Sequence, residues 1–346
     1  MSWTRPLSVF STFINFVDAA TNYPEVKPTV VVAGYGWGAH AFVKNIDNRK
    51  YNIVVVSERD KRLNQNTMLQ SMTPTYTAAA SQVTKDICIS IDKSTQHLKG
   101  TRGSYAYDYL IVATGSEAND FKIPGVRDYC RMCKTAEDVT LLHSSCSAAS
   151  TATILGAGPT GIELACSLKK HGISEVRIIE AAPQILPGFS DAMRNSILKR
   201  LEKKGIQLLL NQPIQAVTST HIQTKNTDIS YKADELLVWT CGIQPVAFVR
   251  TLTGGRPFTT NEFLQVEPRI FALGDSVAGR GPPTAQNANQ QGAYLANYFN
   301  SNFLNKEPYS FNELGRCVDM GDGLLIEIWG FLFFLPSING GDFIAI

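Results

Sequence analysis

The amino-acid sequence predicts an α/β protein built from two βαβ units of similar design. Each unit starts with a short β-branched strand, turns at a glycine-rich motif and continues into a helical pattern, reading TVVVAGYGWGAHAF first and TATILGAGPTGIELA later. A glutamate follows the first glycine of each turn at the same distance, Glu58 after Gly34 and Glu180 after Gly156. This order of strand, glycine turn, helix and acid is typical of a Rossmann-like dinucleotide-binding domain. The sequence therefore predicts two such domains, and two dinucleotides, on one chain.

The first unit supplies the elements that precede residue 121. Residues 29–33 form a β-branched run that reads as a buried parallel strand, and the helix after the turn is expected to continue through Phe42. Further strands are expected over residues 53–56, 86–91 and 109–115, the last of them stopped by a glycine.

The second unit begins at residue 151, and the chain then adds a late strand and helix. Strands are expected over 176–179, 206–210, 235–239 and 269–275, and helices over 193–204 and 284–300. Two prolines precede the last helix, where proline suits the first turn. Apolar patches after residue 301 show no clear period. We expect an N-terminal extension (1–28), a discontinuous first domain (29–120 and 262–302), a second domain (121–261) and a C-terminal tail (303–346).

Composition excludes several classes of protein. The hydrophobic content of 44% and charged content of 18% are ordinary for a folded soluble or peripheral protein, and a net charge of +2 gives no reason to expect a nucleic-acid partner. Seven scattered cysteines argue against a disulfide scaffold and favour a reducing compartment. The longest apolar run, over 324–335, is too short and too interrupted for a transmembrane helix. The first 28 residues lack the arginine-rich, acid-poor character of a mitochondrial presequence.

With these motifs in hand, the chain resembles the flavoproteins with two dinucleotide-binding domains, and among them the type II NADH:quinone oxidoreductases, or alternative NADH dehydrogenases. The blocks that carry the resemblance are VVVAGYGWGAHAF, YDYLIVATGS, TILGAGPTGIELA and FALGDSVAG running into PPTAQNANQQGAYLA. The resemblance implies FAD and NADH as cofactors and a non-proton-pumping NADH dehydrogenase (quinone) as the activity.

The resemblance assigns the first unit to FAD. Gly34 and Gly36 would let the backbone approach the pyrophosphate, and Glu58 would accept from the adenosine ribose. Asp275 would contact the ribityl chain of the flavin. The expected FAD contacts are Gly34, Gly36, Gly38, Glu58, Thr114, Gly115, Gly274 and Asp275.

The second unit would hold NADH. The expected contacts are Gly156, Gly158, Gly161, Glu180 and, in a loop that approaches the nicotinamide, Gly242. The Glu180 carboxylate favours NADH over NADPH because it would repel a 2′-phosphate. Arg177 lies on the strand that precedes Glu180 rather than after it, so it is not placed to offset this repulsion. The family pattern places Glu163 near the nicotinamide as a catalytic residue; a helix-surface charge is the alternative.

The late helix carries the expected acceptor site. In the resembled family its N-terminus points at the flavin ring, where the helix dipole stabilises a reduced, anionic flavin. The resemblance places Gln286, Asn289 and Gln290 against a quinone, with Gln286 and Gln290 as catalytic residues. The alternative is that these amides solvate an exposed turn. We expect no metal site, since the histidines are scattered and the Cys130-x-x-Cys133 pair has no second half.

Two departures from the family bear on the acceptor. The segment between Glu58 and Tyr107 is short and reads KRLNQNTMLQSMTP over 61–74, and the sequence stops at Ile346 without long amphipathic C-terminal helices. We expect peripheral attachment to the reducing side of an energy-transducing membrane (the mitochondrial inner membrane or the cytoplasmic face of a bacterial one), with a membrane surface and a homodimer as further partners. Alternatives are another acceptor (oxygen, a ferredoxin or a disulfide partner) or a degenerate, non-catalytic NADH- and FAD-binding protein.

Overall fold

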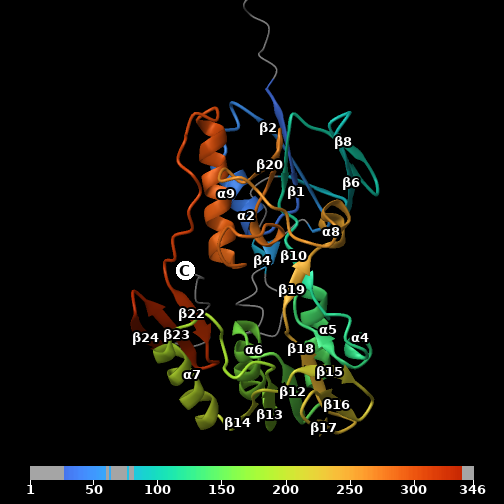
Figure 1. Cartoon of the computed structure of the whole chain (residues 1–346), viewed down its shortest axis with the longest axis vertical. Coiled ribbons are helices and arrows are strands. Elements are labelled where there is room, and N and C mark those ends of the chain that lie inside the picture. The colour runs from blue at the N-terminus through green and yellow to red at the C-terminus, as the bar shows by residue number, and fades with distance from the viewer. Residues whose placement is uncertain (1–26, 60–61, 64–75, 78–81, 337–346) are drawn as a thin grey trace, which may run out of the picture.

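The computed structural model describes residues 27–59, 62–63, 76–77 and 82–336. Two β-sheets lie one above the other along the long axis, and helices and small meanders cover their faces (Figure 1). The chain builds most of the first sheet, passes to the second and then returns to the first. The predicted α/β class with two Rossmann-like sheets is therefore confirmed, while the exact domain boundaries stay a prediction.

The first sheet has six strands in the order β20-β21-β9-β1-β2-β5. They are β1 (Thr29–Ala33), β2 (Asn52–Ser57), β5 (Val83–Lys85), β9 (Tyr109–Val112), β20 (Gln265–Glu267) and β21 (Ile270–Ala272). β20 runs antiparallel to β21, and the other neighbouring strands are parallel. Within β1, Val30 and Val32 join one hydrophobic core and Val31 joins the core on the opposite face. Burial on both faces explains why this strand reads as an uninterrupted apolar run.

Both faces of the first sheet are covered. One face carries α2 (Trp37–Asn45) and α9 (Ala285–Asn300); the other carries α8 (Ala247–Thr253) and a meander of β6 (Cys88–Asp92), β7 (His97–Gly100) and β8 (Ser104–Ala106). The helices α2 and α9 cross so closely that a Cβ added to Gly292 would lie 2.1 Å from the carbonyl oxygen of Gly38. Phe42, Phe271 and Phe299 fill the space beneath them with edge-to-face ring contacts.

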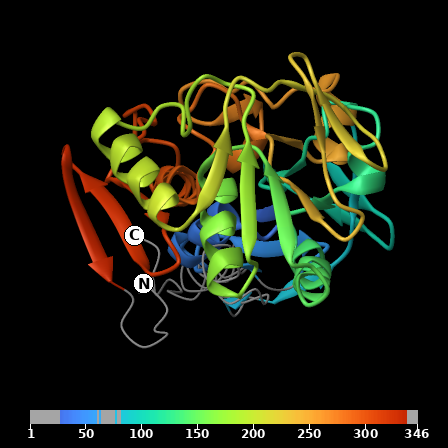
Figure 2. The same ribbon diagram turned by 90° about the horizontal axis from the view of Figure 1, so that it is seen from below.

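The second sheet is parallel, with the order β11-β18-β12-β13-β14. Its strands are β11 (Arg131–Met132), β12 (Thr151–Leu155), β13 (Glu175–Ile179), β14 (Ile206–Leu209) and β18 (Leu236–Trp239). One face packs against α5 (Ala136–Cys146), α6 (Pro159–Lys170) and α7 (Asp191–Lys203); the other packs against α4 (Val126–Tyr129) and a meander of β15 (Ile214–Val217), β16 (His221–Thr224) and β17 (Asp228–Ser230). Figure 2 shows α5, α6 and α7 along one side of the strands and the meander on the other side.

A two-stranded antiparallel ribbon connects the sheets. It pairs β10 (Ser116–Ala118) with β19 (Ile243–Pro245). β10 follows the carboxyl end of β9 in the first sheet, and β19 follows the carboxyl end of β18 in the second. The carboxyl ends of both sheets are therefore turned toward the same ribbon, and ligands of open parallel sheets bind at these ends.

The C-terminal tail is more ordered than the sequence indicated. It forms a three-stranded antiparallel sheet of β22 (Arg316–Asp319), β23 (Gly323–Ile328) and β24 (Phe331–Pro336). Val318 and Leu325 enter the core of the second sheet, and Phe334 lies under the guanidinium of Arg200 at 3.7 Å. The period-2 signal was hidden because β24 carries apolar residues on both faces. In the described part of the chain, no helix combines the length and apolar character needed to cross a membrane.

Several expected boundaries shift for local reasons. The meander strand expected from residue 86 begins at Cys88, because the Asp86 carboxylate accepts the backbone N–H of Ile87 and of Arg102 and so forms a turn. The last helix begins one residue late because Thr284 caps it. The segment 61–74, which departs from the family pattern, lies outside the described residues except for β3 (Arg62–Leu63). β3 pairs with β4 (Tyr76–Thr77). The N-terminal extension lies outside them except for its last two residues.

Candidate functional site

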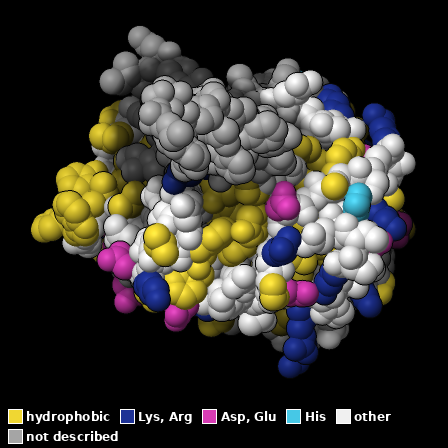
Figure 3. All heavy atoms as spheres, turned by 90° about the horizontal axis from the view of Figure 1, so that it is seen from above, with side chains coloured by type: hydrophobic (Ala, Val, Ile, Leu, Met, Phe, Trp, Pro, Cys, Tyr) yellow, Lys and Arg dark blue, Asp and Glu magenta, His cyan; other side chains and the backbone are white. Residues whose placement is uncertain are grey.

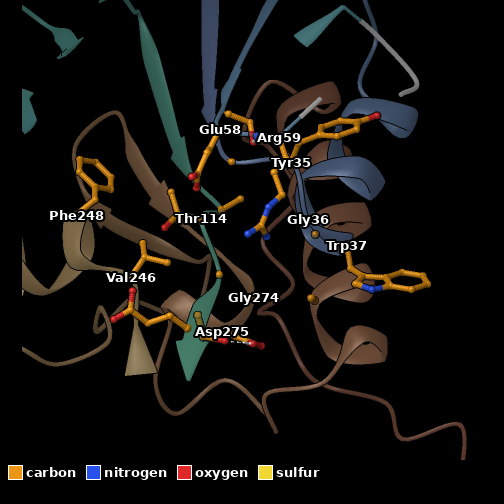
Figure 4. Close-up of a pocket in the computed structure, with 18 of the residues that line it drawn as sticks. Tyr35, Gly36, Trp37, Glu58, Arg59, Thr114, Val246, Phe248, Gly274 and Asp275 are labelled. Atoms are coloured by element: carbon orange, nitrogen blue, oxygen red, sulfur yellow. Dashed lines mark hydrogen bonds between the residues drawn. The ribbon is translucent and has the colours of Figure 1, made fainter. Parts of the chain in front are cut away.

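A pocket at the carboxyl ends of β1, β2, β9 and β21 gathers the residues that the sequence assigned to the first cofactor (Figure 4). Its lining includes Gly34, Gly36, Gly38, Glu58, Thr114, Gly115, Gly274 and Asp275. These residues come from four separate stretches of sequence, and the parallel strands bring them to one edge of the sheet. That edge is where open α/β sheets bind their ligands.

The first glycine turn is shaped by backbone contacts that a side chain would break. Gly34 has a φ of 100°, and a Cβ there would lie 2.4 Å from the carbonyl oxygen of Ala113. Gly36 is different, because a Cβ at this position would meet no described heavy atom within 4 Å. Gly36 is also the N-cap of α2, and no described side chain caps this helix end. The turn thus presents bare backbone and a positive helix end to the pocket, which suits a pyrophosphate.

Gly38 serves mainly the packing of helices. A Cβ on Gly38 would lie 2.2 Å from a side-chain carbon of Leu273 and 3.0 Å from the carbonyl oxygen of Ala288. This glycine therefore keeps α2 close to α9 and to the strand end while it also lines the pocket.

Polar groups in the pocket are placed to receive a ligand. The Thr114 hydroxyl is buried and has no hydrogen-bond partner among the described residues. A buried polar group without a partner is costly, so a ligand that bonds it would be stabilised. Glu58 is exposed at the end of β2, on the same side of the pocket as Thr114 in Figure 4. The bare turn, the unpaired hydroxyl and the acid at the strand end together fit a dinucleotide.

Asp275 lies in the 3-10 turn η1 (Gly274–Ser276) and is held by two neighbours. Its Oδ2 accepts a hydrogen bond of 2.6 Å from the Ser116 hydroxyl and lies 3.6 Å from the Nζ of Lys134. The preceding N–H of Gly274 donates to the side chain of Gln291 at 2.6 Å. Three residues to which the sequence analysis assigned no role, Ser116, Lys134 and Gln291, therefore hold the Gly-Asp turn.

Those three residues give little signal in the sequence. Gln291 is 1% exposed and lies among the buried residues of α9, such as Gly292 and Leu295. Its polar side chain beside these inward-facing positions was the only sign of its role in the sequence. Ser116 and Lys134 act across long sequence separations, and nothing in a single sequence reports such contacts.

The second glycine turn, at the carboxyl end of β12, repeats the geometry of the first. Gly156 has a φ of 111°, and a Cβ on Gly161 would lie 2.0 Å from the carbonyl oxygen of Gly156. A Cβ on Gly158 would meet no described heavy atom within 4 Å, just as at Gly36. Pro159 begins α6 directly after it. The second turn therefore also offers bare backbone at a helix N-terminus.

The acid of the second unit is bonded to its own turn. Glu180 accepts from the backbone N–H of Ala157 at 2.7 Å and from that of Ala182 at 2.8 Å. Arg177, the nearest basic residue on β13, is paired with Glu235 at 2.9 Å and bonded to Thr153. Arg177 is therefore engaged on the sheet, as its position before the strand end suggested.

The loop after β18 meets the second turn. Gly242 has a φ of 71°, and a Cβ there would lie 2.7 Å from the ring of Phe121. Cys241 donates to the carbonyl oxygen of Leu155, and burial raises the pKa of its thiol to about 12. This thiol is therefore protonated at neutral pH. The loop lies beside the second glycine turn, and the expected contact of Gly242 with NADH stays a prediction.

Glu163 faces the C-terminal sheet. Its Oε1 accepts from the backbone N–H of Asp319 in β22 at 3.2 Å. Burial raises the pKa of Glu163 to about 8, with a smaller contribution from the negative charge of Asp319. This contact differs from the solvent-exposed alternative considered for Glu163, and its expected place near the nicotinamide stays a prediction.

The three expected quinone contacts do not line the described pocket. Gln290 donates to the carbonyl oxygen of Asn312 at 2.7 Å and accepts from its N–H at 3.0 Å. Gln286 makes a longer pair of bonds, 3.4 Å to the carbonyl oxygen of Gly315 and 3.2 Å from the N–H of Leu314. Asn289 is exposed. We call residues 312–315 the strap; it is the strap that these amides hold in the structure.

The two cysteines of the Cys-x-x-Cys motif lie in different hydrophobic cores. Cys130 belongs to the core under the meander and Cys133 to the core under the helices. Burial raises the pKa of both thiols to about 12. Across the part of the chain that the structure describes, no cluster of three or more His, Cys, Asp or Glu could hold a metal ion.

The fold and both glycine turns define a class of protein. A family model described as pyridine nucleotide-disulphide oxidoreductase matches residues 28–292, and the chain belongs to this family. The resemblance to alternative NADH dehydrogenases is confirmed by curated relatives. The chain is 29% identical to the external NADH-ubiquinone oxidoreductase 2, mitochondrial, of Saccharomyces cerevisiae, and 30% identical to a probable mitochondrial NADH-ubiquinone oxidoreductase of Schizosaccharomyces pombe.

These matches cover 78% and 79% of this chain and 62% of each relative. The chain therefore spans about three fifths of the length of the curated relatives it matches. Among solved structures, NDH2 from Plasmodium falciparum in complex with NADH has the same fold, with a TM-score of 0.78 at 18% identity. That likeness covers 89% of this chain and 91% of the other.

Proposed function

We propose that this chain binds FAD in the first pocket and NADH at the second glycine turn, and catalyses electron transfer from NADH to a quinone without pumping protons. The observation that carries the proposal is the pair of glycine turns, each with one position open to solvent at a helix N-terminus. The curated relatives named above are NADH-ubiquinone oxidoreductases. FAD, when bound, accepts a hydride from NADH and passes electrons on singly or in pairs.

The chain's residues would bind and orient the cofactors. The turn at Gly36 would hold the FAD pyrophosphate, Thr114 would pair its buried hydroxyl with the ligand, and Asp275 would bond the ribityl hydroxyls. Gly158 and Glu180 would hold the NADH pyrophosphate and ribose. Because the carboxyl ends of both sheets face the ribbon of β10 and β19, the two cofactors would approach each other there.

We further propose that the protein attaches peripherally to a membrane, as its lipid-soluble acceptor requires. The outward face of β24 is apolar and exposed: Phe331 is 68% exposed and Phe333 51%, and Trp329, in the turn before the strand, is 88% exposed. Figure 3 shows hydrophobic side chains gathered at the left edge, the side on which β24 lies in Figure 1. Exposed apolar patches mark interaction sites. The curated relatives are named as mitochondrial proteins, which favours the inner mitochondrial membrane. The proposed site of attachment is the face of that membrane that is exposed to NADH.

Other acceptors remain as alternatives. A disulfide partner is disfavoured because Cys130 and Cys133 lie in separate cores with raised thiol pKa values. Oxygen and a ferredoxin would use the same reduced flavin, so they are distinguished by the rate of reoxidation with each acceptor in turn.

The visible spectrum tests the proposal. The purified protein should be yellow, and NADH should bleach it under anaerobic conditions; adding a soluble quinone should restore the colour. Gly36→Val should give folded but colourless protein, because its side chain enters the open space of the turn. Gly158→Val is the matched control: it should stay yellow but lose bleaching by NADH. A folded Gly36→Val protein with full flavin would show that FAD binds elsewhere.

A further inference from the structure

Lys134 belongs to the second sheet's layer but lines the pocket of the first. It lies between β11 and α5, and its Nζ is 3.6 Å from Asp275 on the far side of the junction between the layers. The described lining of this pocket includes two basic side chains, those of Arg59 and Lys134. None of the motifs that predicted the pocket includes Lys134.

The backbone of Lys134 is fixed by the start of α5. The Asp138 carboxylate accepts from the N–H of Lys134 at 3.0 Å and from that of Thr135 at 2.7 Å, and the Thr135 hydroxyl accepts from the N–H of Asp138 at 3.1 Å. This capping box holds the residue before the helix in one place. The backbone that carries the Lys134 side chain is therefore held in place, and placing the ammonium group in the pocket costs mainly the conformational entropy of that side chain.

The environment of the ion pair makes its charge effective. The side chains of Lys134 and Asp275 are 22% and 17% exposed, so water screens them less than a surface pair. Asp275 is also bonded to Ser116, so Lys134 shares the placement of this carboxylate with a neutral hydroxyl. The ammonium group of Lys134 therefore brings a positive charge to the part of the pocket wall where Asp275 would meet the cofactor.

A second ion pair joins the same two layers. Arg59, next to Glu58, lies 3.2 Å from Glu137 in the first turn of α5. The side chains of Arg59 and Glu137 are 40% and 69% exposed, and ion pairs at such exposed positions contribute little to stability. Glu137 does not line the described pocket. The Arg59–Glu137 pair therefore provides an internal comparison: it ties the layers together without adding charge at the Asp275 end of the pocket.

We propose that Lys134 is a cofactor-positioning residue whose ammonium group offsets the negative charge that bound FAD gains on reduction. This inference rests on the proposed function, because it takes the pocket to be the FAD site. Reduced flavin is more negative than oxidised flavin near neutral pH, so a fixed cation in a partly buried pocket binds the reduced form more tightly. Lys134 thereby raises the midpoint potential of the cofactor and links its retention to contact between the two layers.

The test replaces the charge at nearly constant shape. Lys134→Met should bind FAD more weakly in titrations of apoprotein, with a loss for reduced flavin on the order of tenfold greater than for oxidised flavin. For a two-electron couple a tenfold change lowers the midpoint potential by about 30 mV, measured anaerobically against a reference dye. Lys134→Arg should keep the potential close to that of the unmodified protein.

Glu137→Gln is the control for a purely structural tie. It breaks the other ion pair between the layers by removing a carboxylate that does not line the pocket, and it leaves Lys134 and Asp275 intact, so its potential should not fall below that of the unmodified protein. An equal fall in potential in Glu137→Gln, or an unchanged potential and FAD affinity in a folded Lys134→Met protein, would overturn the inference. Failure of the unmodified protein to bind any FAD would instead overturn the proposed function.

Discussion

The carboxylate of Glu180 illustrates how one residue combines structure and specificity. It closes the second glycine turn by accepting from the N–H groups of Ala157 and Ala182. A carboxylate has about four lone-pair directions, so these two bonds leave capacity for a ribose hydroxyl. The same negative charge opposes a 2′-phosphate. The predicted preference for NADH would thus follow from the same group that shapes the turn.

We expect Glu180→Gln to narrow the gap between NADH and NADPH. Removing a like charge relieves repulsion of the 2′-phosphate, which costs several kcal/mol at close range. The amide NH₂ cannot accept an N–H, so one turn bond is lost and NADH binding should also weaken by roughly 1 kcal/mol. Steady-state kcat/KM with both nucleotides measures the two effects. Equal use of NADH and NADPH by the unmodified protein would contradict this assignment.

Glu163 gives the protein a predictable dependence on pH. Its pKa is about 8 in the folded state against an ordinary 4.5, so between these values the folded state holds a proton that the unfolded chain has released. The free energy of unfolding therefore falls as pH rises through this window. Since the side chain keeps some contact with solvent, we expect a loss of roughly 1–3 kcal/mol between pH 5 and 8.5.

Denaturant unfolding at both pH values measures this loss. Glu163→Gln keeps the acceptor for the N–H of Asp319 but cannot ionise, so its stability should vary less between the two pH values. An unchanged pH dependence in this variant would assign the effect to other groups.

At the residue scale, local motifs were predictable and distant contacts were not. The turns at Gly34 and Gly156 could be predicted because the glycine turn and the helix start are adjacent in sequence and the acid follows at a fixed spacing. The roles of Ser116 and Lys134 could not, because each depends on a partner more than a hundred residues away. Gln286 and Gln290 were recognised as a polar group on the helix, but their partners in the strap became visible only with the fold.

At the scale of elements, α9 connects the pocket to the C-terminal sheet. Its inward face packs on α2 and holds the Gly-Asp turn through Gln291, while Gln286 and Gln290 bond the strap that leads into β22. The helix itself could be predicted from the helical spacing of its apolar residues and from the two prolines before it, whereas its Thr284 cap was seen only in the structure. The strands after it could not, because β24 is apolar on both faces and lacks the alternation that reveals a strand.

We expect the two glutamines of α9 to separate by function. Gln290 makes the shorter bonds, so Gln290→Ala should lower the free energy of unfolding by about 1–2 kcal/mol. Gln286 makes the longer bonds, so its amide can more readily exchange the strap for a quinone carbonyl, and its role as quinone contact stays our prediction. Gln286→Ala should then slow flavin reoxidation by quinone roughly 5- to 150-fold.

Stopped-flow kinetics that follow flavin reduction and reoxidation separately measure the second effect, and denaturant unfolding measures the first. NADH reduction should keep its rate in Gln286→Ala. If both half-reactions keep their rates with quinone, or if only the NADH step slows, Gln286 has no part in the acceptor site.

At the scale of the whole molecule, each of the two sheets presents one glycine turn at its carboxyl end, and the two carboxyl ends lie near each other. Both ends meet the ribbon of β10 and β19, which carries Ser116 on one strand and follows Gly242 on the other. The Trp239 indole N–H donates across this junction to the carbonyl oxygen of Asn119 at 2.8 Å. The pocket of the first sheet is thus lined in part by Lys134 and Thr135 from the second layer, and the ion pair of Lys134 with Asp275 crosses between the layers.

The C-terminal sheet adds a surface that the two cofactor sites do not use, and we expect it to bind membranes. Fully burying one aromatic side chain contributes about 1.5–3 kcal/mol, so each of Phe331→Ser and Phe333→Ser should weaken binding to anionic phospholipid vesicles on the order of tenfold. Because both side chains point away from the core, the thermal midpoint should hardly change. Phe334→Ser is the matched control: this ring packs on the core beneath Arg200, so it should cost stability rather than binding. Vesicle sedimentation and thermal unfolding give the two readouts, and size-exclusion chromatography tests the alternative occupant. If the outward substitutions turn a dimer into a monomer and leave vesicle binding unchanged, the apolar face of β24 joins two copies of the chain instead of a membrane.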